Sequence, residues 1–124
     1  MIHLDTSFLI RALVAGSPEA AELRRRLRAE PINISAIGWS EFLCGPLDAA
    51  QEAAAVRLFP SPEPFIAADS RTAAVLYNRA GRRRGSLADC MIAATALRVG
   101  AAVATSNVAD FRRLAVMGLR IVHV

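Results

Sequence analysis

The sequence contains no lysine, so all 15 of its basic residues are arginine. Only 11 acidic residues stand against them, which leaves a net charge of +4 and a pI near 10.4. Arginine makes bidentate contacts with phosphate groups that lysine cannot make. A GC-rich genome explains an arginine-only composition equally well, and the composition by itself favours neither explanation. The positive charge does indicate an anionic partner.

Long apolar runs are also missing. No stretch approaches the roughly 18 apolar residues of a membrane-spanning helix, and the N-terminus has no signal-peptide pattern. We therefore expect a soluble, cytoplasmic protein without a membrane partner. Cys44 and Cys90 lie in apolar stretches without a CxxC spacing, which predicts reduced core residues. His3 and His123 fall in terminal apolar segments and are interpreted as ordinary strand residues.

Short apolar segments alternate with segments of helical periodicity along the 124 residues, which predicts a single α/β domain, 1–124. We expect strands at 2–4, 31–35, 65–68, 101–106 and 119–124. We expect helices at 18–30, 36–45, 47–59, 70–84, 87–99 and 108–117, several of them preceded by a capping Ser or Asp. Strands that are apolar throughout favour a parallel sheet covered by helices on both faces.

Four acidic residues stand where a charge needs an explanation. Asp5 follows the first strand, Glu41 and Asp89 lie within apolar helices, and Asp110 follows the fourth strand. Functional sites of parallel sheets form at the carboxyl ends of the strands. If the four carboxylates converge there, their repulsion favours protonation or a divalent cation. Oxygen ligands without His or Cys are those of Mg²⁺ or Mn²⁺.

Three of these residues also have a structural interpretation. Asp5 is placed to cap the next helix, Asp89 completes a capping-box pattern with Ser86, and Asp110 fits a solvated loop charge. Glu41 has neither a cap position nor a basic partner four residues away. Taken singly, the first three residues leave both interpretations open.

Four segments carry a resemblance to a known family: LDTSFLIRAL, SAIGWSEFLCG, LADCMIAATAL and VATSNVADF. In their order and spacing they resemble the motif blocks of PIN-domain ribonucleases, and especially the VapC toxins of toxin–antitoxin modules. The resemblance covers nearly the whole chain. It implies a three-layer sandwich with a five-stranded parallel sheet, and cleavage of RNA that depends on Mg²⁺ or Mn²⁺.

Carried over by position, the resemblance makes Asp5, Glu41 and Asp89 the acidic metal ligands and catalytic residues. Where many relatives have a fourth Asp, this chain has Asn107, and Asp110 follows three residues later. We expect Asn107 to line the metal site. We expect Asp110 to be a catalytic residue that lies beside this site or at a second metal ion. The family also has hydroxyl residues that hydrogen-bond the metal ligands or metal-bound water. The matching residues are Thr6, Ser7, Thr105 and Ser106, and each of them also fits helix capping or a hydrogen bond within a loop.

These assignments give a mechanistic hypothesis. Asp5 and Asp89 hold the ion, and Glu41 orients or deprotonates a water bound to it. Attack on phosphorus then leaves a 5′-phosphate and a 3′-hydroxyl, as in the family. The arginine run at 24–28 is typical of a solvated helix face. A second run directly precedes the helix of Asp89 and is expected to contact RNA: Arg82, Arg83 and Arg84.

The resemblance also implies partners. These are an RNA substrate (tRNA, rRNA or mRNA), a VapB-type antitoxin that obstructs the acidic pocket, operator DNA reached only through the antitoxin, and a second copy in a homodimer. The alternative is a non-catalytic PIN-like domain that binds RNA or serves in a repressor complex. A phosphoacceptor receiver domain is disfavoured, because it needs a lysine that the chain lacks and a second acid next to Asp5.

Overall fold

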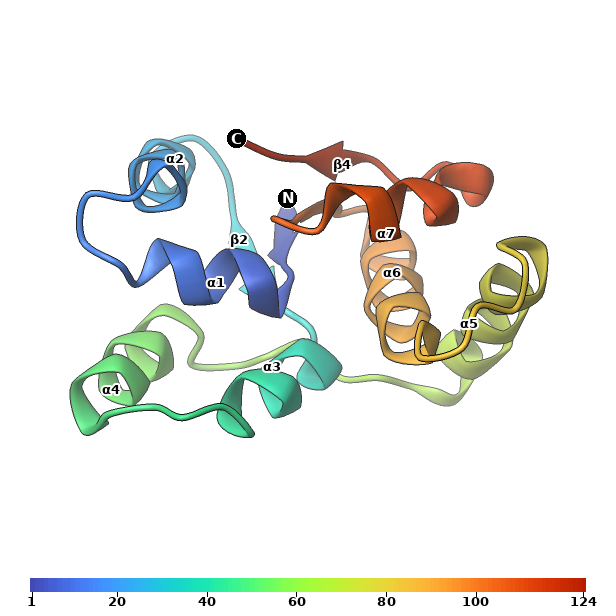
Figure 1. Ribbon diagram of the computed structural model, residues 1–124, viewed down its shortest axis with the longest axis horizontal. Coiled ribbons are helices and arrows are strands. Elements are labelled where there is room, and N and C mark those ends of the chain that lie inside the picture. Colours follow the sequence, from blue (N-terminus) through green and yellow to red (C-terminus); the bar gives the residue numbers. More distant parts are fainter.

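Four short parallel strands form the centre of the fold (Figure 1). In the computed structural model, which describes all of residues 1–124, they are β1 (Ile2–Leu4), β2 (Ile32–Ile34), β3 (Ala102–Ala104) and β4 (Ile121–Val122). Their order in the sheet is β2-β1-β3-β4, and Ile2 of β1 lies opposite Ile32 on one side and Ala102 on the other. The predicted parallel sheet is confirmed, with four strands in place of five.

The predicted strand at 65–68 does not form. Glu63 makes the only pairing at this edge: its amide donates to the carbonyl of Ile34 (2.8 Å), and its carbonyl accepts from the amide of Ala36 (2.7 Å). Prolines stand on both sides of it, at Pro60, Pro62 and Pro64. Because proline has no amide hydrogen to donate, the ladder cannot extend and a single bridge replaces the fifth strand.

Helices cover both faces of the sheet. They are α1 (Thr6–Ala12), α2 (Pro18–Leu27), α3 (Ala36–Leu43), α4 (Ala49–Leu58), α5 (Ala67–Arg79), α6 (Leu87–Val99) and α7 (Val108–Arg112), followed by the 3-10 turn η1 (Arg113–Met117). Figure 1 shows α1, α2 and α4 on one side of the strands and α5 and α6 on the other. None of these helices is long and apolar enough to cross a membrane. The short α1 was not among the predicted helices.

Successive strand residues belong to two different cores. Ile2 and Leu4 of β1 pack with Phe8 of α1, whereas Val103 of β3 packs with Ile92 of α6. Side chains of a strand alternate between the faces of a sheet, so a strand covered on both faces has to be apolar at every position. The sheet is therefore packed against apolar side chains on both faces.

His3 is the polar exception within this core. Its side chain is fully buried, and neither ring nitrogen has a hydrogen-bond partner. Burial lowers the pKa of His3, and the nearby charge of Glu63 opposes that effect only in part. The imidazole is therefore held in its neutral form inside the protein.

We expect His3→Leu to stabilise the protein by about 1–3 kcal/mol, because the apolar side chain removes the cost of burying unpaired polar atoms. The advantage of the variant grows as the pH falls below about 6.5. His3 of the unfolded wild type then binds a proton, whereas buried His3 of the folded protein stays neutral, so this residue lowers the stability of the wild type. Urea unfolding at about pH 8 and about pH 5 measures both effects. A variant less stable than the wild type at both pH values would contradict this prediction.

Helix α5 ends earlier than predicted. It stops at Arg79 rather than continuing to residue 84, and Gly81 and Arg82 adopt left-handed backbone conformations with φ of +92° and +55°. A residue with positive φ cannot continue a right-handed helix. The arginines at 82–84 consequently lie in an exposed loop before α6.

The two cysteines lie in different environments. Cys90 of α6 is buried in the core, as predicted. Cys44 caps the carboxyl end of α3 and is exposed, so the prediction that it is a core residue was wrong. Phe42 of the same helix is buried, whereas Leu43 beside Cys44 is also exposed.

Candidate active site

The candidate site lies at the carboxyl ends of β1 and β3, which are neighbours in the sheet. Asp5 directly follows β1, and its amide donates to the carbonyl of Ala104 at the end of β3 (2.8 Å). Thr105 directly follows β3, and its hydroxyl donates to the Asp5 carboxylate. The parallel order of the strands thus joins residues that lie 100 positions apart in the chain.

Two hydroxyl groups hold the Asp5 carboxylate, which is only 3% exposed. Ser7 Oγ and Thr105 Oγ1 both donate to Asp5 Oδ2, at 2.7 and 2.9 Å. Each hydroxyl accepts in turn from a backbone amide, Ser7 from Ser106 (3.1 Å) and Thr105 from Asn107 (2.9 Å). Asp5 makes no capping hydrogen bond with α1. Capping therefore does not account for this carboxylate, and Ser106 supports it through its amide.

Helix α3 brings Glu41 to the site. Ser35 starts the helix by accepting a hydrogen bond from the amide of Gly38 (3.0 Å). Thr6 Oγ1 donates to the carbonyl of Gly38 (2.9 Å) and lies 3.5 Å from Glu41 Oε1, so it ties α3 to the start of α1. Partial desolvation, followed by the negative charge of Asp5, raises the pKa of Glu41. The exposed Glu41 side chain is therefore close enough to Asp5 to sense its charge.

Helix α6 carries Asp89 in its first turn. The capping box that the sequence suggests does not form, because Ser86 makes no capping bond and instead donates its hydroxyl to the carbonyl of Arg83 (2.7 Å). No ion pair includes Asp5, Glu41 or Asp89. The structural interpretation of Asp89 as a cap partner was thus wrong, and its carboxylate makes no hydrogen bond or ion pair with another side chain.

The environment of Asp89 is strongly unfavourable to its charge. Burial is the first cause that raises the pKa of Asp89, which reaches about 7. The next causes are the negative charges of three other carboxylates: Asp5, Glu41 and Asp110. The guanidinium of Arg83 acts in the opposite direction. The other three acidic residues singled out in the sequence therefore all lie close enough to Asp89 for their charges to act on it.

The fourth corner of the site is built differently from the other three. Asp110 of α7 forms an ion pair with Arg83, with its Oδ1 2.7 Å from Arg83 Nη1. Asn107 is the N-cap residue of α7, and its exposed side chain makes no capping hydrogen bond. Arg83 thus neutralises the charge of Asp110, whereas the amide side chain of Asn107 makes no hydrogen bond with α7.

The arrangement of the possible ligands bears on the divalent ion that the resemblance implies. No group of three or more His, Cys, Asp or Glu side chains is arranged so that it could hold a metal ion. The available donors are carboxylate, hydroxyl and amide oxygens, which suit hard cations. Mg²⁺ commonly keeps several water ligands and contacts only one or two carboxylates. The residue types therefore fit Mg²⁺ or Mn²⁺, although they do not form a closed cage.

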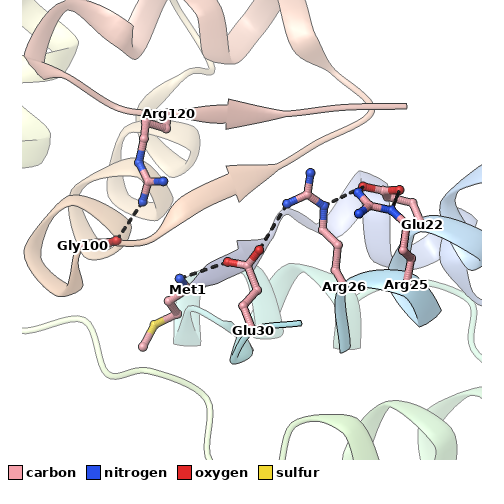
Figure 2. Close-up of polar contacts among 7 residues, drawn as sticks. All are labelled: Met1, Glu22, Arg25, Arg26, Glu30, Gly100 and Arg120. Atoms are coloured by element: carbon pink, nitrogen blue, oxygen red, sulfur yellow. Dashed lines mark hydrogen bonds and ion pairs between the residues drawn. The ribbon is translucent and has the colours of Figure 1, made fainter. Parts of the chain in front are cut away.

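The arginines differ in how their charge is used. On α2, Arg25 and Arg26 both bind Glu22, while Glu30 binds Arg26 and the amino group of Met1 (Figure 2). Hydrogen bonds from the two arginines lower the pKa of Glu22 to about 2. Acidic neighbours thus offset much of the charge of the α2 arginine run, as expected of a solvated helix face.

The arginines near the acidic group have less compensation. Arg82 stacks on the Tyr77 ring, 5.5 Å from its centre, and hydrogen-bonds Asn78. Arg83 binds Asp110. Sequence reasoning missed Arg113, which lines a pocket together with Arg84 beside Asp89. The adjacent arginines of the segment DFRR gave only a weak signal, since nothing in the sequence tells which of the two faces the site.

Comparisons with known proteins show the family of the chain. The model of the family described as "PIN domain" matches residues 2–117. The chain is 40% identical over 121 residues to Ribonuclease VapC11 of Mycobacterium tuberculosis, an alignment that covers 90% of this chain and 89% of the relative. A VapC ribonuclease of Mycobacterium bovis matches with the same identity and coverage.

Among solved structures, VapBC2 from Rickettsia felis bound to a promoter DNA fragment has a TM-score of 0.79 at 18% identity, covering 100% of this chain and 99% of that one. This likeness concerns the fold alone. The family model covers nearly the whole chain, and the VapC relatives are similar over the same length. The chain therefore belongs to the PIN-domain family and, within it, to the VapC ribonucleases.

Proposed function

We propose that this protein is a metal-dependent endoribonuclease and the toxin of a VapBC-type toxin–antitoxin pair. The main support is the convergence of Asp5, Glu41 and Asp89 from three separate elements, without an arginine neutralising any of them. Gathering unpaired carboxylates in this way costs stability, and structural need does not explain it. The names of the relatives, which are ribonucleases, support the same activity.

The proposed cofactor is Mg²⁺ or Mn²⁺. Asp5 and Asp89 would hold the ion, with Glu41 and the amide oxygen of Asn107 at the margin of the site, and Asp110 beside it. When bound, such an ion lowers the pKa of water and draws negative charge from a phosphate. It would also offset the repulsion that raises the pKa of Asp89.

The chain's own residues have separable tasks in the proposed reaction. Ser7 and Thr105 fix the direction of the Asp5 carboxylate through their bonds to Oδ2, which leaves Oδ1 without a hydrogen bond. Glu41 is exposed and has a raised pKa, so it is suited to accept a proton from the attacking water. Water adds to phosphorus, the bond from phosphorus to the 3′-oxygen breaks, and that oxygen takes up a proton. The products are a 5′-phosphate and a 3′-hydroxyl.

The proposed partners follow from the family. Solved structures that share this fold include a toxin–antitoxin complex from Klebsiella pneumoniae, with a TM-score of 0.67 and 27% identity over 90% of each chain. We propose a VapB-type antitoxin, contact with operator DNA only through that antitoxin, a homodimer, and a tRNA, rRNA or mRNA substrate. Arg83 and the neighbouring arginines of the loop before α6 would contact the RNA beside the cluster of carboxylates.

The proposal is tested by incubating purified protein with total bacterial RNA and mapping the fragment ends. We expect fragments with 5′-phosphates in Mg²⁺ or Mn²⁺ and none in EDTA, because the carboxylates alone repel the phosphate backbone. Ends that carry 2′,3′-cyclic phosphates, or equal cleavage in EDTA, would contradict the proposal. RNA binding without any fragment in either ion would instead support the non-catalytic alternative.

A further inference from the structure

A pocket opens directly beside Asp89 and has an unusual lining. It lies between the loop before α6 and the end of α7, and its lining includes Arg83, Arg84, Asp89, Asp110 and Arg113. Two carboxylates and three guanidinium groups thus share one small space. Asp110 and Arg83 neutralise each other by their ion pair of 2.7 Å.

The other two arginines of the pocket are not compensated. Arg84 and Arg113 appear in none of the ion pairs or side-chain hydrogen bonds of the protein, in contrast to the arginines of α2. Guanidinium groups fit phosphate oxygens with two parallel hydrogen bonds, and a pair of them in a concave site suits one phosphate group. The position of the pocket next to Asp89 places such a phosphate close to the proposed reaction centre.

We propose that Arg84 and Arg113 form a subsite for an RNA phosphate that flanks the scissile one. The inference rests on the proposed ribonuclease function and adds to it a defined place for the neighbouring nucleotide. Arg82 lies outside the pocket, because it is held on Tyr77 and Asn78. Arg83 is a positioning residue, since Asp110 fixes it at the boundary between the carboxylates and the subsite.

The sequence offers a matched control for this subsite. Arg112 and Arg113 are adjacent and both exposed, but only Arg113 lines the pocket. Replacing either residue with alanine changes the net charge equally. A difference between the two variants therefore reports the pocket and not the general positive charge of the protein.

The experiment first establishes that the wild-type chain cleaves a defined RNA in Mg²⁺, which tests the proposed function separately. Cleavage of that RNA is then compared for Arg84→Ala, Arg113→Ala and Arg112→Ala, with thermal melting to verify folding. We expect KM to rise roughly tenfold for Arg84→Ala and Arg113→Ala with kcat nearly unchanged, because the lost contact is to a phosphate that does not itself react. Arg112→Ala should behave like the wild type.

Binding of a labelled oligouridylate of about 20 nucleotides gives a second measurement that does not depend on cleavage. For Arg113→Ala, the slope of log affinity against log salt should shrink by about 0.7, the value for one phosphate contact on a single strand. An RNA with uncharged methylphosphonates at single positions should identify one linkage that weakens cleavage by the wild type but not by Arg113→Ala. Equal KM values and equal salt slopes for Arg112→Ala and Arg113→Ala, with wild-type cleavage intact, would overturn the subsite.

Discussion

Asp89→Asn should abolish RNA cleavage, by about 10³-fold or more, and at the same time stabilise the metal-free protein. The loss of activity is expected because asparagine is neutral. Its side chain therefore binds a divalent ion only weakly and does not balance the positive charge of the ion. The stabilisation follows from the environment of Asp89, where burial and three neighbouring carboxylates oppose ionisation. A residue retained at a cost to stability is typical of a functional site.

The sign of the stability effect can be stated for each pH. The pKa of Asp89 rises from 3.8 in the unfolded chain to about 7 in the folded protein, so the folded state binds the proton more tightly between these values. The contribution of Asp89 to the stability of the metal-free wild type therefore falls as the pH rises from about 4 to about 7 and is constant above that range. The full shift corresponds to about 4 kcal/mol. Screening by water reduces this for a partly exposed carboxylate, to about 1–2 kcal/mol.

Urea unfolding in EDTA measures this difference. At about pH 8, Asp89→Asn should exceed the wild type by this amount, and at about pH 4 the two should coincide. Added Mg²⁺ should raise the stability of the wild type at pH 8 and have little effect on the variant. The exposed Asp48→Asn variant is a control for the change of charge, because asparagine keeps a side-chain oxygen that can cap α4. An Asp89→Asn protein that is less stable than the wild type at pH 8 would contradict the proposed environment.

Much of the site could be predicted because its residues follow local rules. Asp5 and Thr105 end neighbouring apolar strands, and parallel strands bring their carboxyl ends to one edge. Glu41 has no basic partner in its own helix, and in the fold it lies beside the hydroxyl of Thr6 and senses the charge of Asp5. The prediction of a strand at 65–68 was wrong. It gave more weight to the apolar residues of this segment than to the preceding prolines, which prevent a ladder of hydrogen bonds.

The remaining features depend on tertiary contacts that local patterns do not contain. The ion pair of Asp110 with Arg83 joins positions 27 residues apart, and it exists only because α5 ends early and the following loop turns toward α7. The same loop decides that Arg84, and not Arg82, faces the pocket. The Ser86–Asp89 capping box was favoured by its spacing, but Ser86 bonds to the preceding loop instead. In each case, the backbone path of residues 80–86 determines the outcome.

Thr105→Val should lower cleavage by about 10–100-fold although Thr105 touches neither the substrate nor the proposed ion. Valine has nearly the shape of threonine but lacks the hydroxyl that donates to Asp5 Oδ2 (2.9 Å) and accepts from the amide of Asn107 (2.9 Å). Asp5 is then held only by Ser7, and its carboxylate can rotate. The misdirected carboxylate should bind Mg²⁺ more weakly, so the Mg²⁺ concentration for half-maximal activity should rise by a similar factor.

A second buried threonine separates this positioning role from a general effect of removing a hydroxyl. Thr95 of α6 is also fully buried, and its hydroxyl donates only to the carbonyl of Met91 (3.0 Å). Both Thr→Val changes should cost about 1 kcal/mol or less of stability, but only Thr105→Val should change the Mg²⁺ dependence. Saturating Mg²⁺ should partly restore its activity, since weak binding is then compensated by concentration. If the two variants show the same Mg²⁺ dependence, the hydroxyl pair around Asp5 does not orient a metal ligand, and the assignment of Asp5 as such a ligand loses its structural basis.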